Sequence, residues 1–232
     1  MKRNTFFKGL ILAMVLICGV VSCATGTVYL KDASKYTSTT FKSEVDWDVY
    51  TFTWGDYKLV SDSQTKEKKV DFAKYGMKDY ESKSGFISDF KRTKKLLYEV
   101  VFLSGTKKLS KDNIVKNAAE NYIVIDKTKL KVNPSTESVI ISDNSYMPVK
   151  VTPINQMLRD GKVYNMLANA NAGVKINLYG QDYAVVDYIS ETPTILMNNK
   201  FNKELTQEET DFAAALLLSL YELNQTYSGF TD

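Results

Sequence analysis

The residue with the clearest chemical potential in this sequence is Cys23, because a thiolate is a strong nucleophile. Cys23 follows an uncharged, apolar run from Gly9 to Val21, and the basic residues Lys2, Arg3 and Lys8 precede that run. The run is too short to cross a bilayer, which takes about 20 apolar residues. A basic start followed by a short apolar run predicts an export signal instead. The sequence therefore places a nucleophilic sulfur beside a membrane during export.

The residues around Cys23 resemble the lipobox of bacterial lipoproteins. In that family an aliphatic and a small residue precede the acylated cysteine, as Val20, Val21 and Ser22 do here. The resemblance implies a signal peptide over residues 1–22 and lipid attachment, including palmitate, at Cys23. It also implies a protein tethered to a membrane of the cell envelope, facing the periplasm or the cell surface.

Other outcomes for the N-terminus stay open. Ser22 and Ala24 could form the small-residue pair of an ordinary secretory signal, or the segment could remain as an uncleaved anchor. By resemblance to the sorting rules of some bacteria, Ala24 after the cysteine favours the outer membrane. Cys18 lies inside the apolar run, where we expect a small apolar filler that is removed with the signal. The mature chain then has no thiol left for an internal disulfide.

The sequence contains no histidine, which removes the commonest general base and most zinc or copper sites. An enzyme built from this chain would depend on carboxylates, lysine, tyrosine or bound ions. Ser104 and Lys107 give the spacing S-x-x-K, and Ser142, Asp143 and Asn144 spell S-D-N. These two motifs resemble those of penicillin-binding proteins and β-lactamases, which use a serine nucleophile.

The rest of the chain weakens that resemblance. Ser63 and Lys66 form a second S-x-x-K, as chance predicts for a sequence so rich in serine and lysine. The third motif, K-T-G, is missing, and its nearest approach at residues 83–85 lies before the other two. Ser104 is also predicted in a turn after a strand, whereas the family needs its serine at the start of a buried helix. We therefore predict no catalytic residue.

Carboxylates offer the remaining candidates. Asp46 and Asp48 alternate along a predicted strand and could bind a cation or act as a glycosidase-like acid and base, although acids on a solvent-facing strand edge are commoner. Asp126, Asp143 and Asn144 could supply further oxygen ligands. The chain has no D-x-D-x-D-G loop, no Walker A loop and no G-x-G-x-x-G after a strand. We therefore expect neither a metal nor a cofactor, and leave any ligand-binding residues unassigned.

The charge balance and the aromatic residues indicate which kinds of partner the protein could bind. Residues 1–22 carry three basic residues and no acid, which leaves 27 basic and 27 acidic residues in the mature chain. This balance argues against a nucleic-acid partner. The 15 tyrosines could line a ligand groove, while Trp47 and Trp54 are expected in the core rather than on a sugar-stacking platform.

The elements that would position these residues are predicted from hydrophobic periodicity and capping signals. Residues 23–44 have the composition of a tether, and residues 45–232 form one domain. We expect strands over 45–60, 98–103, 122–126, 130–132, 138–142, 147–151, 174–179, 183–189 and 194–197, and helices near 84–90, 110–122, 153–167 and 206–223. In the last of these, Thr206 and Glu209 form a capping box before a run that is apolar nearly all round, so this helix must be buried.

Together these features predict an α+β fold in which a mostly antiparallel sheet packs against three or four helices, including a buried C-terminal helix. The function they favour is a non-catalytic envelope lipoprotein that binds a small-molecule ligand or another envelope protein. The alternative is a histidine-independent hydrolase, based on carboxylates or on Ser/Lys, that acts on cell-wall or glycan polymers. A purely structural role without a small-molecule site is a third hypothesis.

Overall fold

Short turns divide most of the chain into antiparallel hairpins. The computed structural model describes residues 26–47, 49–62, 70–107, 119–126, 128–132, 138–139, 147–167 and 170–227. Its strands are β1 (Thr27–Val28), β2 (Tyr36–Thr40), β3 (Lys42–Asp46), β4 (Val49–Trp54), β5 (Tyr57–Asp62), β6 (Tyr80–Arg92), β7 (Lys95–Lys107), β8 (Ala119–Ile125), β9 (Thr128–Val132), β10 (Ser138–Val139), β11 (Val149–Ile154), β12 (Gln156–Arg159), β13 (Lys162–Asn165), β14 (Gly173–Leu178), β15 (Gln181–Asp187) and β16 (Thr194–Asn198). The helical elements among the described residues are the 3-10 turn η1 (Ala33–Lys35) and the α-helix α2 (Gln207–Tyr227).

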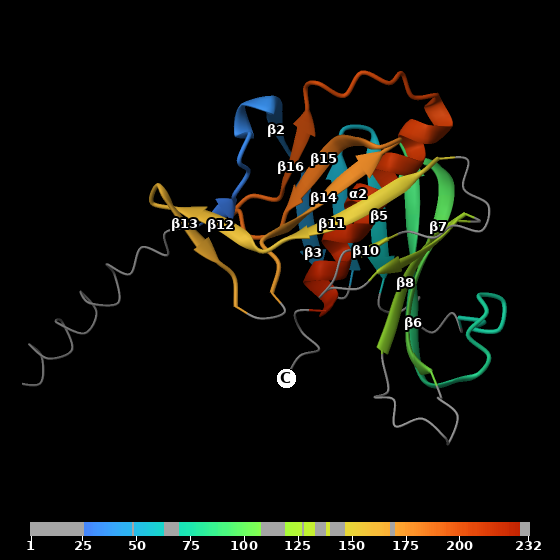
Figure 1. Ribbon diagram of the computed structural model, residues 1–232. Coiled ribbons are helices and arrows are strands. Elements are labelled where there is room, and N and C mark those ends of the chain that lie inside the picture. The colour runs from blue at the N-terminus through green and yellow to red at the C-terminus, as the bar shows by residue number, and fades with distance from the viewer. Residues whose placement is uncertain are drawn as a thin grey trace, which may run out of the picture.

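The strands form three antiparallel sheets. Sheet I has the order β3-β4-β5-β6-β7-β8-β9, sheet II the order β10-β11-β14-β15-β16-β2, and sheet III the order β1-β12-β13. Sheets I and II meet at two edges, because β2 runs into β3 through the buried Phe41 and β9 lies against β10. Helix α2 contacts β5, β7 and β8 on one side and β15 on the other, so it lies between the two large sheets (Figure 1).

The core therefore forms around a single helix. Every residue of α2 from Asp211 to Glu222 is buried, which explains why the sequence is apolar nearly all round. Ser219 and Glu222, two of the polar residues in this buried stretch, are both hydrogen-bonded within the protein. Ser219 Oγ donates to the Ala215 carbonyl at 2.6 Å, and the Glu222 carboxylate accepts hydrogen bonds from Ser88 Oγ at 3.0 and 3.1 Å. No helix in the described ranges combines the length and the apolar character needed to span a bilayer.

The start of α2 confirms the predicted capping box. The Glu209 backbone N–H donates to Thr206 Oγ1 at 3.2 Å, and the Thr206 backbone N–H donates to Glu209 Oε2 at 2.7 Å. Two amides that the helix leaves without an intrahelical acceptor are thus both bonded.

We expect Thr206→Ala to lower the free energy of unfolding by about 1 kcal/mol, since the helix loses its N-cap acceptor. Urea unfolding followed by circular dichroism measures the change. Thr206→Ser is the matched control, because it keeps a hydroxyl at the cap and should unfold close to wild type. Equal destabilisation by both substitutions would show that the cap hydroxyl is not the cause.

The predicted fold class was wrong. The structure is built mostly from antiparallel strands with one α-helix in the described part of the chain, and not as an α+β fold with three or four helices. Residues 84–90 lie in β6, and residues 153–167 run through β11, β12 and β13. The region predicted as a helix over 110–122 ends in β8, and its residues 110–118 lie outside the described ranges.

Two tight turns explain the wrong helix over 153–167 and the wrong single strand over 45–60. Asp160 and Gly161, with φ of 51° and 72°, close the β12–β13 hairpin as a two-residue turn of the type that Asp-Gly favours. Trp47, with φ of 55°, lies in the turn that joins β3 to β4, so residues 45–60 cover the end of β3, all of β4 and the start of β5.

Other strand predictions were confirmed. β7 contains the predicted strand 98–103, and β14 and β15 form the predicted hairpin, closed by Tyr179 and Gly180 with φ of 53° and 78°. The predicted tether was wrong for residues 27–44. These residues belong to the folded part, since β1 pairs with β12, β2 with β16 and β3 with β4.

Candidate functional site

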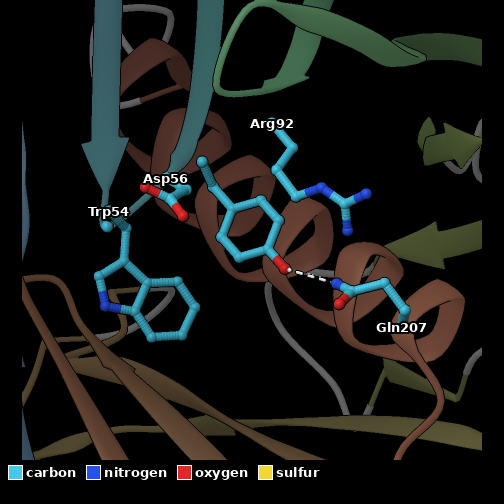
Figure 2. A pocket seen from close by; sticks show the side chains of 6 residues that line it. Trp54, Asp56, Arg92 and Gln207 are labelled. Carbon is cyan, nitrogen blue, oxygen red and sulfur yellow. Dashed lines mark hydrogen bonds between the residues drawn. The ribbon is translucent and has the colours of Figure 1, made fainter.

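A pocket lies where the β4–β5 turn, the end of β6 and the start of α2 meet. This pocket is open to solvent and has a volume of about 280 Å³. Its lining residues are Trp54, Gly55, Asp56, Tyr57, Arg92 and Gln207. Figure 2 shows Trp54 and Asp56 on one side of it and Arg92 and Gln207 on the other.

Strand pairing brings most of these residues together. Trp54 and Tyr57 face each other across the two-residue turn Gly55-Asp56, in which Gly55 has a φ of 56° that a glycine adopts readily. Tyr57 also pairs with Arg92 on the neighbouring strand. The Asp56 carbonyl accepts a hydrogen bond from the Thr93 backbone N–H at 2.7 Å. This bond joins the β4–β5 turn to the β6–β7 turn.

The pocket has an aromatic wall. The ring centroids of Trp54 and Tyr57 are 6.5 Å apart at an interplanar angle of 37°. Tyr57 stacks in turn on the buried Phe90, at 5.6 Å and 14°. Trp54 Nε1 lies 3.5 Å from Thr39 Oγ1, at the limit of a hydrogen bond. Packing from both neighbours therefore holds the two rings in place before any ligand binds.

The polar side of the pocket is organised by Asp211, whose side chain is 8% exposed. Its carboxylate accepts hydrogen bonds from Arg92 Nη1 at 2.9 and 3.0 Å, from the Tyr57 hydroxyl at 2.9 Å and from Gln207 Nε2 at 2.8 Å. Gln207 Nε2 also lies 3.4 Å from the Tyr57 hydroxyl (Figure 2). Burial, followed by the bond to the Asp211 carboxylate, raises the pKa of Tyr57, so its hydroxyl keeps its proton and stays a donor at neutral pH.

This arrangement suits binding better than proton transfer. The one buried carboxylate at the pocket is balanced by a guanidinium and accepts bonds from three side chains, which leaves it little capacity to act as a base. What the pocket offers a ligand is apolar ring area next to planar polar groups.

A second carboxylate, Glu120 on the outer face of sheet I, also has its hydrogen-bonding capacity used within the protein. Glu120 accepts hydrogen bonds from the hydroxyls of Tyr80 and Tyr122 and pairs with Lys131. Burial raises the pKa of Glu120, but the bonds from Lys131 and from the two tyrosines outweigh it and hold that pKa at about 2. A carboxylate ionised so firmly is a weak general base at neutral pH.

The Ser/Lys constellation is not assembled as a penicillin-binding protein would need it. Ser104 lies inside strand β7, opposite Ser84 of β6, and not at the start of a helix as in that family. The prediction that Ser104 lies in a turn was therefore wrong. Lys107 is the last residue of β7, and Lys83 Nζ donates to the Lys78 carbonyl at 2.9 Å. The segments that contain Ser142, Asp143 and Asn144, and Ser63 with Lys66, lie outside the described ranges.

The two predicted carboxylate candidates that the structure describes, Asp46 and Asp126, lie toward opposite edges of sheet I. Asp46 is exposed at the end of β3, and Asp126 is exposed in the β8–β9 turn, while Asp48 lies outside the described residues. Within the described ranges no group of three or more cysteines, aspartates or glutamates is placed to hold a metal ion. The prediction that Trp47 lies in the core was also wrong, because its side chain is 96% exposed.

Sequence reasoning missed the pocket residues as a set. Trp54 was expected in the core but is only half-buried, and no site role was predicted for Asp211. The available signal was the Gly55-Asp56 pair between two aromatic residues, which is typical of a hairpin turn. The contacts of Arg92 and Tyr57 with α2 span 119 and 154 residues, so no local pattern shows them.

The predicted lipid-attachment residue, Cys23, lies outside the described ranges, but the chain four residues later is firmly placed. The Val28 backbone N–H donates at 3.0 Å to Asp187, a carboxylate that is 2% exposed. Asp187 also accepts bonds from Ser190 Oγ at 2.6 Å and from the backbone N–H groups of Ile189 and Ser190. Strand β1 is therefore tied to the core by a buried, fully bonded acid.

Searches against protein-family models, curated proteins and solved structures found no match to this chain.

Proposed function

We propose that this protein is a bacterial envelope lipoprotein, held to a membrane by a lipid on Cys23, and that its folded domain binds a glycan fragment in the Trp54–Tyr57 pocket without catalysing a reaction. The observation that carries the binding role is the pocket itself. It joins an aromatic wall to an Asp211 carboxylate whose hydrogen-bonding capacity is already used within the protein.

The chemistry of the lining residues supports a glycan as the ligand class. A sugar ring has an apolar face of C–H groups that packs on an aromatic ring, and a rim of hydroxyls that bonds to planar polar groups. The rings of Trp54 and Tyr57 offer the first kind of surface, while Arg92 and Gln207 offer the second. A lipoprotein whose domain faces the periplasm would also meet cell-wall glycan.

The competing hydrolase receives less support from this pocket. Glycoside hydrolysis generally uses two carboxyl groups, one free to donate a proton and one free to act as base or nucleophile. Here Asp211 is neutralised by Arg92, which leaves Asp56 as the one other carboxyl group among the lining residues, and the sequence contains no histidine to supply a second free group. A binding role requires no such free group.

The test is binding of soluble peptidoglycan fragments, each a disaccharide with a short peptide, measured by isothermal titration calorimetry. We expect Trp54→Ala to weaken binding by about tenfold or more, since it removes the main stacking surface. Trp47→Ala is the matched control, because it removes the other tryptophan from an exposed turn outside the pocket and should leave affinity unchanged.

Gln207→Ala is a second variant for the same affinity measurement. It carries little risk to folding, because Gln207 is exposed at the first position of α2. It should weaken binding by a smaller factor than Trp54→Ala. Equal affinity of wild type, Trp54→Ala and Gln207→Ala would contradict the assignment of the ligand to this pocket. Release of cleaved sugar from the fragments by the wild type would contradict the non-catalytic role.

A further inference from the structure

Sheet III has an edge strand, β13, whose residues are all exposed. It is a small sheet at the side of the molecule, where the β12–β13 hairpin projects next to β1 (Figure 1). Val28 and Met157, which are cross-strand partners, turn inward and pack in a cluster with Ala172 and Val185. Because side chains alternate along a strand, Leu158 and its partner Val163 lie on the opposite face.

That outer face and the segment after it expose apolar side chains. Leu158 is 38% exposed and Val163 is 44% exposed, although both belong to paired strands. Leu167, two residues beyond β13, is 86% exposed, and Tyr164, which pairs with Met157 on the other face of the hairpin, is 44% exposed. Exposed apolar side chains gathered on one projecting hairpin are typical of an interaction surface.

The position of the anchor indicates what meets this surface. Thr27 pairs with Leu158, and Cys23 precedes Thr27 by four residues. Four residues of extended chain span at most about 14 Å. A lipid on Cys23 therefore fixes the bilayer surface within that distance of β1, and the Val28–Asp187 bond keeps β1 in place on the domain.

The charges of the hairpin lie at its turn. Arg159 and Lys162 flank the β12–β13 turn, and one acid, Asp160, lies between them. Arg159 Nε is 3.8 Å from the Asp160 carboxylate, so one basic charge of the three-residue group remains in excess. As cross-strand partners, Arg159 and Lys162 share the face that carries Met157, so they flank the apolar face of Leu158 and Val163 and do not lie on it.

From this geometry we infer that the outer face of the β12–β13 hairpin is a membrane-contacting surface, which rests on the bilayer next to the lipid on Cys23. The inference rests on the proposed lipidation, because the anchor is what brings the bilayer to this face. The hairpin gives the domain a fixed orientation on the membrane, with Leu158, Val163 and Leu167 toward the lipid.

The experiment uses the full-length protein, processed and lipidated in cells, purified and reconstituted into vesicles of phosphatidylethanolamine and phosphatidylglycerol. Val163→Cys and Leu167→Cys are labelled with an environment-sensitive fluorophore. Leu96→Cys is the matched control, because Leu96 is an apolar residue of similar exposure, 47%, that lies in sheet I beside the β6–β7 turn. Quenching by spin-labelled lipid and by aqueous iodide then reports what surrounds each label.

We expect the labels at residues 163 and 167 to be quenched by lipid and shielded from iodide, as for groups buried about 5–10 Å into the headgroup boundary. The label at residue 96 should show the reverse. Iodide quenching at residues 163 and 167 that equals the quenching at residue 96 would overturn the inference. So would shielding of residues 163 and 167 from both quenchers, since a second copy of the chain would then cover the face.

The unsubstituted protein separates failure of this inference from failure of the proposed lipidation. Cys18 and Cys23 are its only cysteines, and the proposal removes Cys18 with the signal and blocks the sulfur of Cys23. Uptake of the thiol label by unsubstituted protein would mean that Cys23 is free, and would refute the anchor itself. An unlabelled unsubstituted protein with iodide-accessible labels at residues 163 and 167 would refute the hairpin contact alone.

Discussion

Cys23→Ala is expected to abolish incorporation of labelled palmitate and to move the protein from the detergent phase to the aqueous phase on detergent partitioning. The physical reason is that the proposed acyl chains each contribute about 0.8 kcal/mol per buried methylene to membrane binding, and alanine offers no nucleophile to accept them. Metabolic labelling of cells that express wild type or variant, followed by partitioning of the extracts, measures both effects.

Cys18→Ala is the matched control, since it removes the other cysteine from within the apolar run and should leave labelling unchanged. Palmitate incorporation by Cys23→Ala at the wild-type level would contradict lipidation at this residue. An intact mass of the native protein with an unmodified thiol, or with a start other than residue 23, would contradict it as well.

Leu217→Ala should lower the free energy of unfolding by about 2–5 kcal/mol, because it leaves a cavity in the one helix that both large sheets pack on. Leu217 is fully buried in α2, in the same core cluster as residues of β5, β7, β8 and β15. A loss of this size is a large share of the roughly 5–15 kcal/mol that holds a typical domain together. Urea denaturation at equilibrium gives the value.

Leu96→Ala makes the same chemical change at a leucine that is 47% exposed, and we expect an effect of about 0.5 kcal/mol or less. If the two variants unfolded at the same urea concentration, α2 would not be the centre of the core. Loss of all folded signal in Leu217→Ala would agree with a change at the upper end of the expected range.

The C-terminal helix could be predicted from sequence because its signals are local and agree with one another. Thr206 and Glu209 bond each other across three residues, and the apolar run that follows is too long for a strand. An apolar run without a polar face must be enclosed on all sides. The structure meets that requirement by placing sheets I and II around it.

The β6–β7 hairpin could not be predicted in the same way, because both of its faces are covered. Phe86, Ser88 and Phe90 turn toward α2, while Ile87 on the same strand packs in a separate cluster outside the sheet. That outer cluster contains Met77 and Phe72, which precede the hairpin in the chain. Two apolar faces remove the alternation that marks a half-buried strand, and the spacing of Phe86, Ile87 and Phe90 then resembled a helix.

Pro153 misled the prediction for a different reason. A proline after Thr152 is a good helix start, yet Pro153 lies in β11 and pairs with Val174 of β14. On the other side of β11 the described pairing with β10 ends at Val151. A strand tolerates a proline where its missing N–H faces no partner. Only the sheet order decides which edge is free.

The sequence by itself determined the capped and buried helix at the C-terminus and the positions of several hairpin strands, and it is the source of the export signal and lipidation site that we propose at the N-terminus. Each of these depends on residues within a few positions of one another. Tertiary structure decided the number of helices, the pocket between Trp54 and Arg92, and the placement of the β12–β13 hairpin beside β1. These features depend on pairings over long stretches of chain, as between Val28 and Asp187, and burial rather than local preference selects which of those pairings form.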